Sequence, residues 1–145
     1  MEYVGWANSI EQKGDIIWVL NAYPRAYYYL GYLWFELGNF ETALNFIDQG
    51  LNLDPTNPVL HNEKAQALVG LKRLPEALQI YEQIISFTGF VTHHNKAVAL
   101  RGKGFIMIEM GNLSEAENAF YQSQKFEPDS ELAIKELKYI QQLRN

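Results

Sequence analysis

Three histidines are the residues of this chain best suited to bind a metal or to exchange protons near neutral pH. His93 and His94 are adjacent, so on a helix their side chains diverge by about 100° and do not converge easily on one ion. His61 lies far from them in the sequence. We therefore interpret the pair as part of a solvated loop or helix start, and we expect no metal site.

Two further motifs resemble functional signatures only in part. The segment RGKG begins at Arg101, but Ala97 stands where the first glycine of a phosphate-binding loop belongs. The triplet that starts at Asn112 fits the glycosylation sequon, but Ser114, three residues before Glu117, is better explained as a helix cap. No Ser/His/Asp spacing and no carboxylate pair stands out. We expect no catalytic residue, no cofactor and no enzymatic activity.

Composition narrows the class of partner. The chain has 145 residues, 48% of them hydrophobic, which suits one globular domain. Its net charge of −5 argues against nucleic acid and anionic membranes as partners. There is no cysteine, so disulfides and thiol chemistry are excluded. The N-terminus lacks the basic start of a signal peptide, and Glu36 and Asn39 interrupt the most apolar segment, so we expect a cytoplasmic protein.

An aromatic segment, AYYYLGYLWFELGNFETAL, runs from Ala26 to Leu44. On a helix of 3.6 residues per turn, its large side chains form three stripes. A helix that is apolar all round is buried on several sides. The first stripe is Tyr27, Leu30, Gly31 and Trp34, the second is Tyr28, Tyr32 and Phe35, and the third is Tyr29 and Leu33.

The elements that must position these side chains repeat along the sequence. Four small or turn-forming residues recur at one constant offset: Gly31, Gly38, Ala43 and Pro55 reappear as Gly104, Gly111, Ala116 and Pro128. An intermediate copy places Ala65 34 positions after Gly31, and Gly104 follows Ala65 by 39, so the segment GFVTHHNKA carries an insertion. Apolar spacing is helical throughout, which predicts an all-α fold whose small residues let helices approach closely.

This pattern resembles the tetratricopeptide repeat, whose period is 34 residues and whose signature combines W-x₂-L-G-x₂-Y, A-x₃-F and a closing proline. The first copy matches with Tyr27, Leu30, Gly31, Trp34, Ala43, Ile47 and Pro55, and the third with Leu100, Gly104, Met107, Ala116, Phe120 and Pro128. Lys103, His61, Lys64 and Gly89 depart from the signature. The resemblance implies a right-handed α-solenoid of antiparallel helix pairs.

We predict a single domain with five parts. They are a degenerate helical unit at 1–23, repeats at 24–57, 58–91 and 92–129, and a capping helix at 130–145. In the degenerate unit, a first helix should turn at Gly14 and Asp15, and a second, Ile16 to Tyr23, should end at Pro24. Helix starts are expected at Asn57, Pro75, Thr92 and Ser114, turns at Gly38 and Gly111, and an apolar face of the capping helix at Leu132, Ala133, Leu137 and Ile140.

In this family the first stripe packs on the second helix of its own pair, and the second stripe, here Tyr28, Tyr32 and Phe35, lines the concave face. The resemblance therefore implies a peptide-binding groove with charges at its rim. The third stripe, Tyr29 and Leu33, would lie against the preceding N-terminal helices. The predicted groove residues are Arg25, Tyr28, Tyr32, Phe35, Glu36, Asn62, Gln66, Val69, Arg101, Phe105, Ile108 and Glu109. Aromatic side chains with a polar rim are typical of peptide recognition. The alternative is that the short N-terminal helices cover the aromatic stripe, which would then be core.

Heat-shock co-chaperones of this family hold a C-terminal carboxylate with a clamp of Lys, Asn, Asn, Lys and Arg. At the matching places this chain has Tyr28, Tyr32, Glu63, Val98 and Gly102; counted from the N-terminal unit, it has Val4, Asn8, Tyr29, Val59 and Glu63. Neither frame supplies the cations that capture of a carboxylate requires. We therefore do not expect that specialised role.

The sequence predicts a protein-interaction module that captures a peptide or helix of a partner protein. Two alternatives remain: a small chaperone-like protein of the secretion-chaperone type, and a structural homo-oligomer. We also expect a homodimer through residues 1–23, because a short second helix leaves many apolar groups uncovered. These groups are Tyr3, Trp6, Ile10, Ile16, Ile17, Trp18 and Leu20. Folding back of this unit onto the first repeat would instead leave a monomer.

Overall fold

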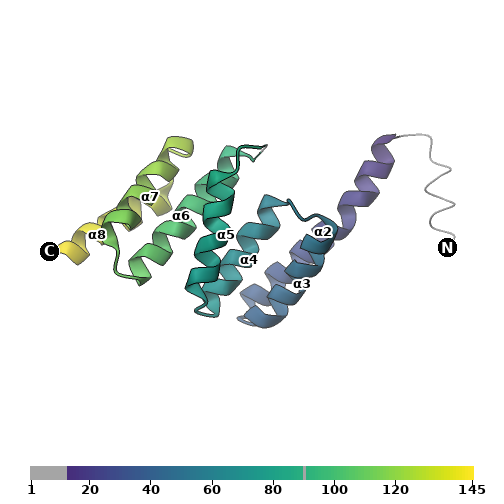
Figure 1. Cartoon of the computed structure of the whole chain (residues 1–145), viewed down its shortest axis with the longest axis horizontal. Coiled ribbons are helices and arrows are strands. Elements are labelled where there is room, and N and C mark those ends of the chain that lie inside the picture. Colours follow the sequence, from purple (N-terminus) through teal and green to yellow (C-terminus); the bar gives the residue numbers. More distant parts are fainter. Residues whose placement is uncertain (1–12, 90) are drawn as a thin grey trace.

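The computed structural model describes the backbone of residues 13–89 and 91–145, and the side chains of residues 23–89 and 91–145. Within these ranges the chain forms seven α-helices and no strand (Figure 1). The helices are α2 (Lys13–Glu36), α3 (Phe40–Leu53), α4 (Pro58–Gly70), α5 (Leu74–Ser86), α6 (His93–Glu109), α7 (Leu113–Phe126) and α8 (Glu131–Arg144). The predicted all-α fold class is confirmed.

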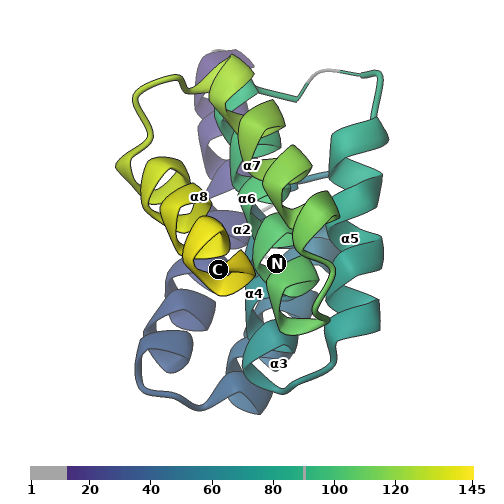
Figure 2. The same cartoon turned by 90° about the vertical axis from the view of Figure 1, so that its left-hand side faces the viewer.

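The helices form a row of antiparallel pairs with α2 at one end and α8 at the other (Figures 1 and 2). The pairs are α2 with α3, α4 with α5, and α6 with α7, and α8 packs on α7. The first helices of neighbouring pairs also contact each other, α2 with α4 and α4 with α6. They therefore form the inner wall of a solenoid, where groove residues were predicted. None of the described helices is long and apolar enough to cross a membrane.

The turn inside each pair uses the same local chemistry in the first and third pairs. Gly38 and Gly111 adopt φ of 76° and 77°, a conformation that glycine reaches without strain. The asparagine after each glycine caps the next helix, since Asn39 Oδ1 accepts from Thr42 N at 3.2 Å and Asn112 Oδ1 accepts in the same way. The second pair places Lys72 at this position with φ of 60°.

The predicted cap at Ser114 is wrong, because α7 begins one residue earlier, at Leu113, and Asn112 supplies the capping oxygen. A side chain that directly follows the turn glycine reaches the first free N–H groups sooner than a serine two residues later. The expected helix starts at Asn57 and Thr92 are confirmed, since both side chains accept bonds from the first turn of their helices. Pro75 lies in the first turn of α5, as predicted.

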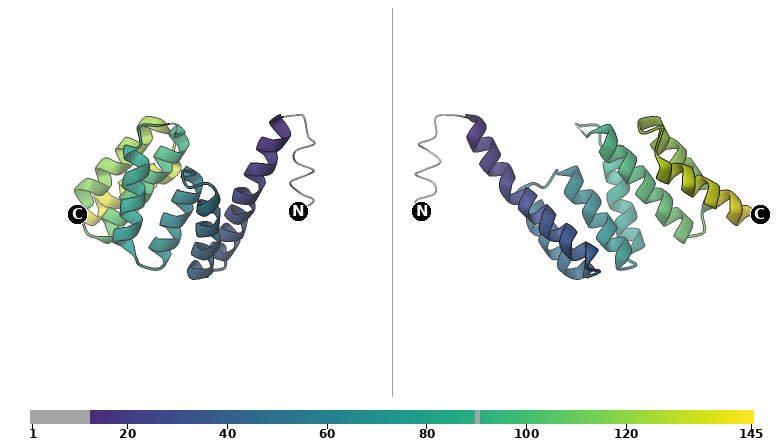
Figure 3. Two further views of the ribbon diagram at one scale, coloured as in Figure 1. Left: turned by 45° about the vertical axis from the view of Figure 1, so that its right-hand side comes forward. Right: turned by 180° about the vertical axis from the view of Figure 1, so that it is seen from behind.

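The expected helix end at Pro24 is absent, because α2 continues through this proline to Glu36. The expected turn at Gly14 and Asp15 is absent too, since α2 begins at Lys13. Proline removes one backbone bond to the preceding turn, but a helix of 24 residues keeps its bonds on both sides. Figure 3 shows the first part of α2 projecting beyond α3. The predicted helix preceding this turn lies outside the described residues.

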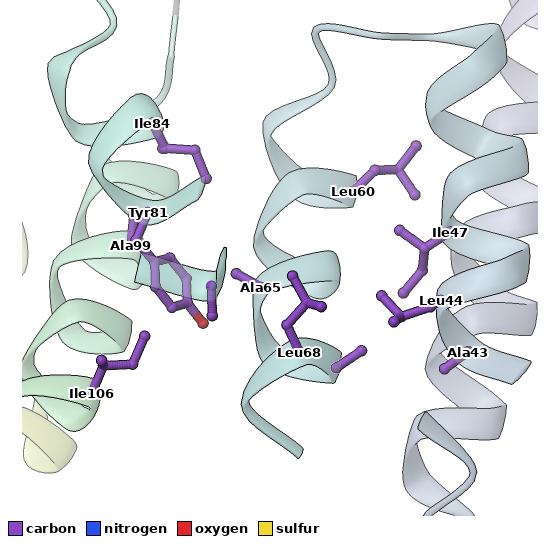
Figure 4. Close-up of a cluster of buried hydrophobic side chains, with 12 residues drawn as sticks. Ala43, Leu44, Ile47, Leu60, Ala65, Leu68, Tyr81, Ile84, Ala99 and Ile106 are labelled. Atoms are coloured by element: carbon purple, nitrogen blue, oxygen red, sulfur yellow. The ribbon is translucent and has the colours of Figure 1, made fainter. Parts of the chain in front are cut away.

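Two clusters of buried side chains hold the pairs together. The larger spans α3 to α6, and Figure 4 shows Leu44 and Ile47 of α3 facing Leu60 and Leu68 of α4. The smaller joins α6, α7 and α8 through Met107, Ala116, Phe120, Ala133, Leu137 and Ile140. Burying apolar surface between successive helices is the main stabilising term in a solenoid. In α8, Leu132 departs from the predicted apolar face and is exposed.

Candidate functional site

An open groove of about 670 Å³ lies along the inner wall of the solenoid. Its floor comes from Phe35 of α2, Val69 of α4, and Phe105 and Ile108 of α6. These side chains gather because α2, α4 and α6 contact one another in turn, and Phe35 and Phe105 also pack edge-to-face on Phe40 of α3 and Phe120 of α7. The floor is therefore mainly aromatic and branched aliphatic.

Seven of the twelve predicted groove residues line this one hollow. They are Phe35, Gln66, Val69, Arg101, Phe105, Ile108 and Glu109. Tyr32 and Glu36 lie beside it on the exposed surface of α2, and Tyr32 is 45% exposed. Neither Tyr32 nor Phe35 is enclosed by the described helices. The alternative prediction is that the N-terminal residues cover this stripe. Residues 1–12, which would have to do so, lie outside the described ranges.

Arg25 and Tyr28 belong to a separate hollow of about 480 Å³. It is lined by Pro24, Arg25, Tyr28, Tyr29, Asp54, Asn57, Val59 and Leu60. Asn62 differs from its predicted place at the surface, because it is only 3% exposed. Its Nδ2 donates to the carbonyl of Asn95 at 3.4 Å, so the packing of α6 against α4 covers it. Asn62 Oδ1 has no hydrogen-bond partner among the described residues.

One wall of the groove was not predicted from the sequence. Leu132, Glu136 and Tyr139 of α8 line it, so the capping helix contributes a second face beside its buried one. Their spacing of four and three residues is the helical signal that could have identified this face. Phe40, Gly70, Lys72, Tyr81, Val98 and Gly102 complete the lining.

The charge of Arg101 is neutralised inside the molecule. Its Nη1 donates to Glu127 Oε2 at 2.5 Å, and His94 Nδ1 donates to the other oxygen of Glu127. Burial alone would raise the pKa of Glu127, but these two hydrogen bonds outweigh it and hold the pKa below its usual value. Lys72 lies 3.6 Å from Glu109 at the opposite rim. The two cations of the groove are therefore both near carboxylates.

Outside the groove lining, α2 and α4 carry aromatic rings together with acids. The rings of Tyr28 and Tyr32 are stacked with centroids 6.4 Å apart. Burial raises the pKa of Glu63, and the negative charge of Glu36 raises it further. The pKa of Tyr28 is raised by burial and then by Glu63. Glu63 is therefore a half-buried carboxylate that interacts electrostatically with Tyr28 and with a second acid, Glu36.

A raised carboxyl pKa has a consequence for stability. The folded state holds the Glu63 proton more tightly than the unfolded chain does, so this residue lowers stability as pH rises above the ordinary value of 4.5. We expect Glu63→Gln to melt at a higher temperature than the parent at neutral pH. The difference should vanish well below pH 4.5, where the carboxyl is protonated in both states. Thermal melts over this pH range measure it, with Glu115→Gln on the exposed face of α7 as the control. A lower melting temperature for Glu63→Gln at neutral pH would contradict the prediction.

Gly102 has no room for a side chain. A Cβ atom there would lie 2.7 Å from Cε1 of Tyr81 and closer still to Cζ. Tyr81 is 2% exposed, so its ring is fixed between α4, α5 and α6. This position is the last of the five that a carboxylate clamp would use, and the fold fills it with an aromatic ring.

The three histidines lie in three different settings. His61 Nε2 donates to the carbonyl of Pro55 at 2.7 Å, His93 stacks near Phe126, and His94 binds Glu127. No group of three His, Asp or Glu side chains among the described residues is arranged to hold a metal. The chemistry that the groove offers is therefore apolar contact, aromatic stacking and charge.

Comparison with known sequences gives one family and several relatives. Residues 24–57 match the family described as "Tetratricopeptide repeat". The chain is 30% identical over 112 residues to "RNA polymerase II-associated protein 3" of Rattus norvegicus, a match that covers 77% of this chain and 16% of the relative. It is 31% identical over 80 residues to "Uncharacterized protein ycf37" of Pyropia yezoensis, which covers 55% of this chain and 42% of the relative. The chain thus matches less than half the length of either relative.

Solved structures share the fold. The first TPR of Spaghetti (RPAP3) bound to HSP90 peptide SRMEEVD has a TM-score of 0.72 at 23% identity, covering 83% of this chain and 92% of that one. The N-terminal domain of stress-induced protein-1 (STI-1) from C. elegans has a TM-score of 0.69 at 25% identity, covering 84% and 97%. At these identities the likeness concerns the arrangement of helices, and the groove chemistry must be read from this chain's own residues.

Proposed function

We infer from its fold and its relatives that this chain, which belongs to the tetratricopeptide repeat family, is a protein-interaction module. The groove along α2, α4 and α6 holds a segment of a partner protein. The observation that carries this proposal is the open groove whose floor consists of Phe35, Val69, Phe105 and Ile108, all of them partly exposed. Aromatic floors of this kind supply most of the binding energy in peptide grooves. In this proposal the chain binds a partner in the cytoplasm and performs no chemistry of its own.

Peptides selected on the full chain from a random library displayed on phage provide the test. A selected peptide, synthesised with a fluorophore, should bind Phe105→Ala at least about tenfold more weakly, because aromatic anchors dominate such interfaces. Tyr121→Ala removes an exposed ring from α7, outside the groove, and should bind as the parent does. Gln66→Arg provides a second groove variant, because its longer polar side chain should obstruct the groove. It keeps the test valid if Phe105→Ala fails to fold. Full binding by both groove variants would refute the proposal.

A homodimer belongs to the same proposal. The outer face of α2 keeps Leu33 and Leu37 at 53% and 66% exposure, so the end of the row presents apolar surface that a second copy would cover. The side chains of residues 1–22, which were predicted to take part, lie outside the described side chains. We expect light scattering to report about twice the monomer mass of 16.7 kDa. A constant monomer mass over a wide range of concentrations would show that the chain covers this surface itself.

A further inference from the structure

The groove lining holds two acids, Glu109 and Glu136, and two cations, Lys72 and Arg101. Two further acids, Glu36 of α2 and Glu63 of α4, lie outside this lining and act on each other electrostatically. Arg101 is bound to Glu127 and Lys72 lies near Glu109. Within the described part of the chain, none of Glu36, Glu63 and Glu136 is in an ion pair.

The basic side chains nearest in sequence to Glu36 and Glu63 contact other parts of the molecule. Lys64, next to Glu63 in the sequence, bonds to Asp48 on α3 at 2.7 Å. Arg25 opens into the separate hollow with Asp54. It precedes Glu36 by eleven residues, which is about 16 Å along a helix. The acids on the α2 side of the groove therefore present their charge to whatever enters it.

Two stacked tyrosine rings lie on the same helix as Glu36. Tyr32 lies one turn before Glu36 on α2, and its exposed ring stacks on Tyr28. Glu63 on α4 is near enough to raise the pKa of Tyr28. Exposed aromatic faces attract cations, and a carboxylate at the same place adds a charge-assisted hydrogen bond. Partial burial of Glu63 and the negative charge of Glu36 both disfavour the ionised form of Glu63. A cation bound next to Glu63 would stabilise that form.

The two acids Glu36 and Glu63 are close in sequence to residues that line the groove. Glu36 follows Phe35 of the floor, and Glu63 lies one turn before Gln66 of the groove wall. We propose that the groove selects a partner segment with a lysine or arginine, which sits between Tyr32, Glu36 and Glu63, next to apolar side chains that fill the floor. This inference rests on the proposed function and adds the chemistry of its ligand. A segment with acidic residues at this place would meet like charge.

The phage selection on the full chain tests this directly. Recovered peptides should be enriched in lysine or arginine beside apolar residues. The double variant Glu36→Gln with Glu63→Gln should bind a synthetic basic peptide from the selection about tenfold more weakly, as expected for loss of a charged hydrogen bond. Glu115→Gln removes one acid from α7, away from the groove, and should bind as the parent does. The peptide SRMEEVD should show no binding to the full chain.

The remaining outcomes distinguish failure of the cation preference from failure of the proposed peptide-binding function. Acidic or neutral peptides that lose binding to Phe105→Ala would overturn the cation preference and leave the groove as a peptide site. Binding of SRMEEVD at the groove would overturn it in the same way. If no recovered peptide depends on Phe105 or Gln66, both proposals fall. A charge exchange adds a positive criterion: Glu63→Lys should bind the same peptide better once its basic residue is replaced by glutamate.

Discussion

Replacing Gly31 by leucine is expected to unfold the chain rather than to weaken binding alone. A Cβ at this position would lie 2.6 Å from Cγ1 of Ile47, which is fully buried where α2 crosses α3. Overpacking by even a few atoms costs about 1–3 kcal/mol, and leucine adds four carbons. A small domain is stable by only about 5–15 kcal/mol in total. Thermal melts followed by circular dichroism should show a large loss of melting temperature or no cooperative transition.

A matched control separates crowding from the side chain itself. Ala26 lies in the same helix and is exposed, so Ala26→Leu introduces the same group without a crossing helix. It should melt close to the parent. Ala77→Leu, at the small position on the second helix of the second pair, should behave like Gly31→Leu because Ala77 is fully buried. A Gly31→Leu variant that melts like the parent would mean that the helices do not cross here.

The helix pairs could be predicted because each boundary is fixed locally. Gly38 and Gly111 form turns through φ values that few other residues adopt, and Asn57 and Thr92 cap the starts of α4 and α6. The failure at Pro24 has the opposite cause. A proline removes one backbone hydrogen bond from a helix. Whether the helix ends at the proline depends on the hydrogen bonds of the turns before and after it, and the residues next to the proline do not reveal these.

The floor of the groove could be predicted for a similar reason. Helical spacing groups Phe35, Val69 and Phe105 on equivalent stripes of their helices, and the resemblance to the repeat family places that stripe on the inner face. The spacing of Leu132, Glu136 and Tyr139 shows that they share one face of α8, but that this face borders the groove, and that Asn62 is buried, depends on how one helix packs on the next. The contact of Tyr81 with Gly102 belongs to this second class, since the two residues lie on different helix pairs. Tertiary packing thus decides which ligands the predicted groove excludes.

Introducing arginine at Gly102 is expected to destabilise the protein without creating a site for acidic peptides. The new Cβ would meet the ring of Tyr81, which has almost no exposed surface and no space to move into. The cost should be about 1–3 kcal/mol or more. Gln66→Arg places the same side chain on the wall of the same groove at a residue that is partly exposed, so its melting temperature should stay near that of the parent.

Removing the ring tests the cause. Tyr81→Ala alone leaves a cavity and should cost about 3–5 kcal/mol, as for other buried aromatic residues. If the ring is what excludes a side chain at 102, the double variant Tyr81→Ala with Gly102→Arg should be more stable than the sum of the two single changes predicts. Denaturant unfolding of the four proteins gives this coupling free energy. Strict additivity of the two changes in unfolding free energy would show that the backbone of α6, and not Tyr81, excludes a cationic side chain at position 102. The lack of a cation there would then follow from the path of α6.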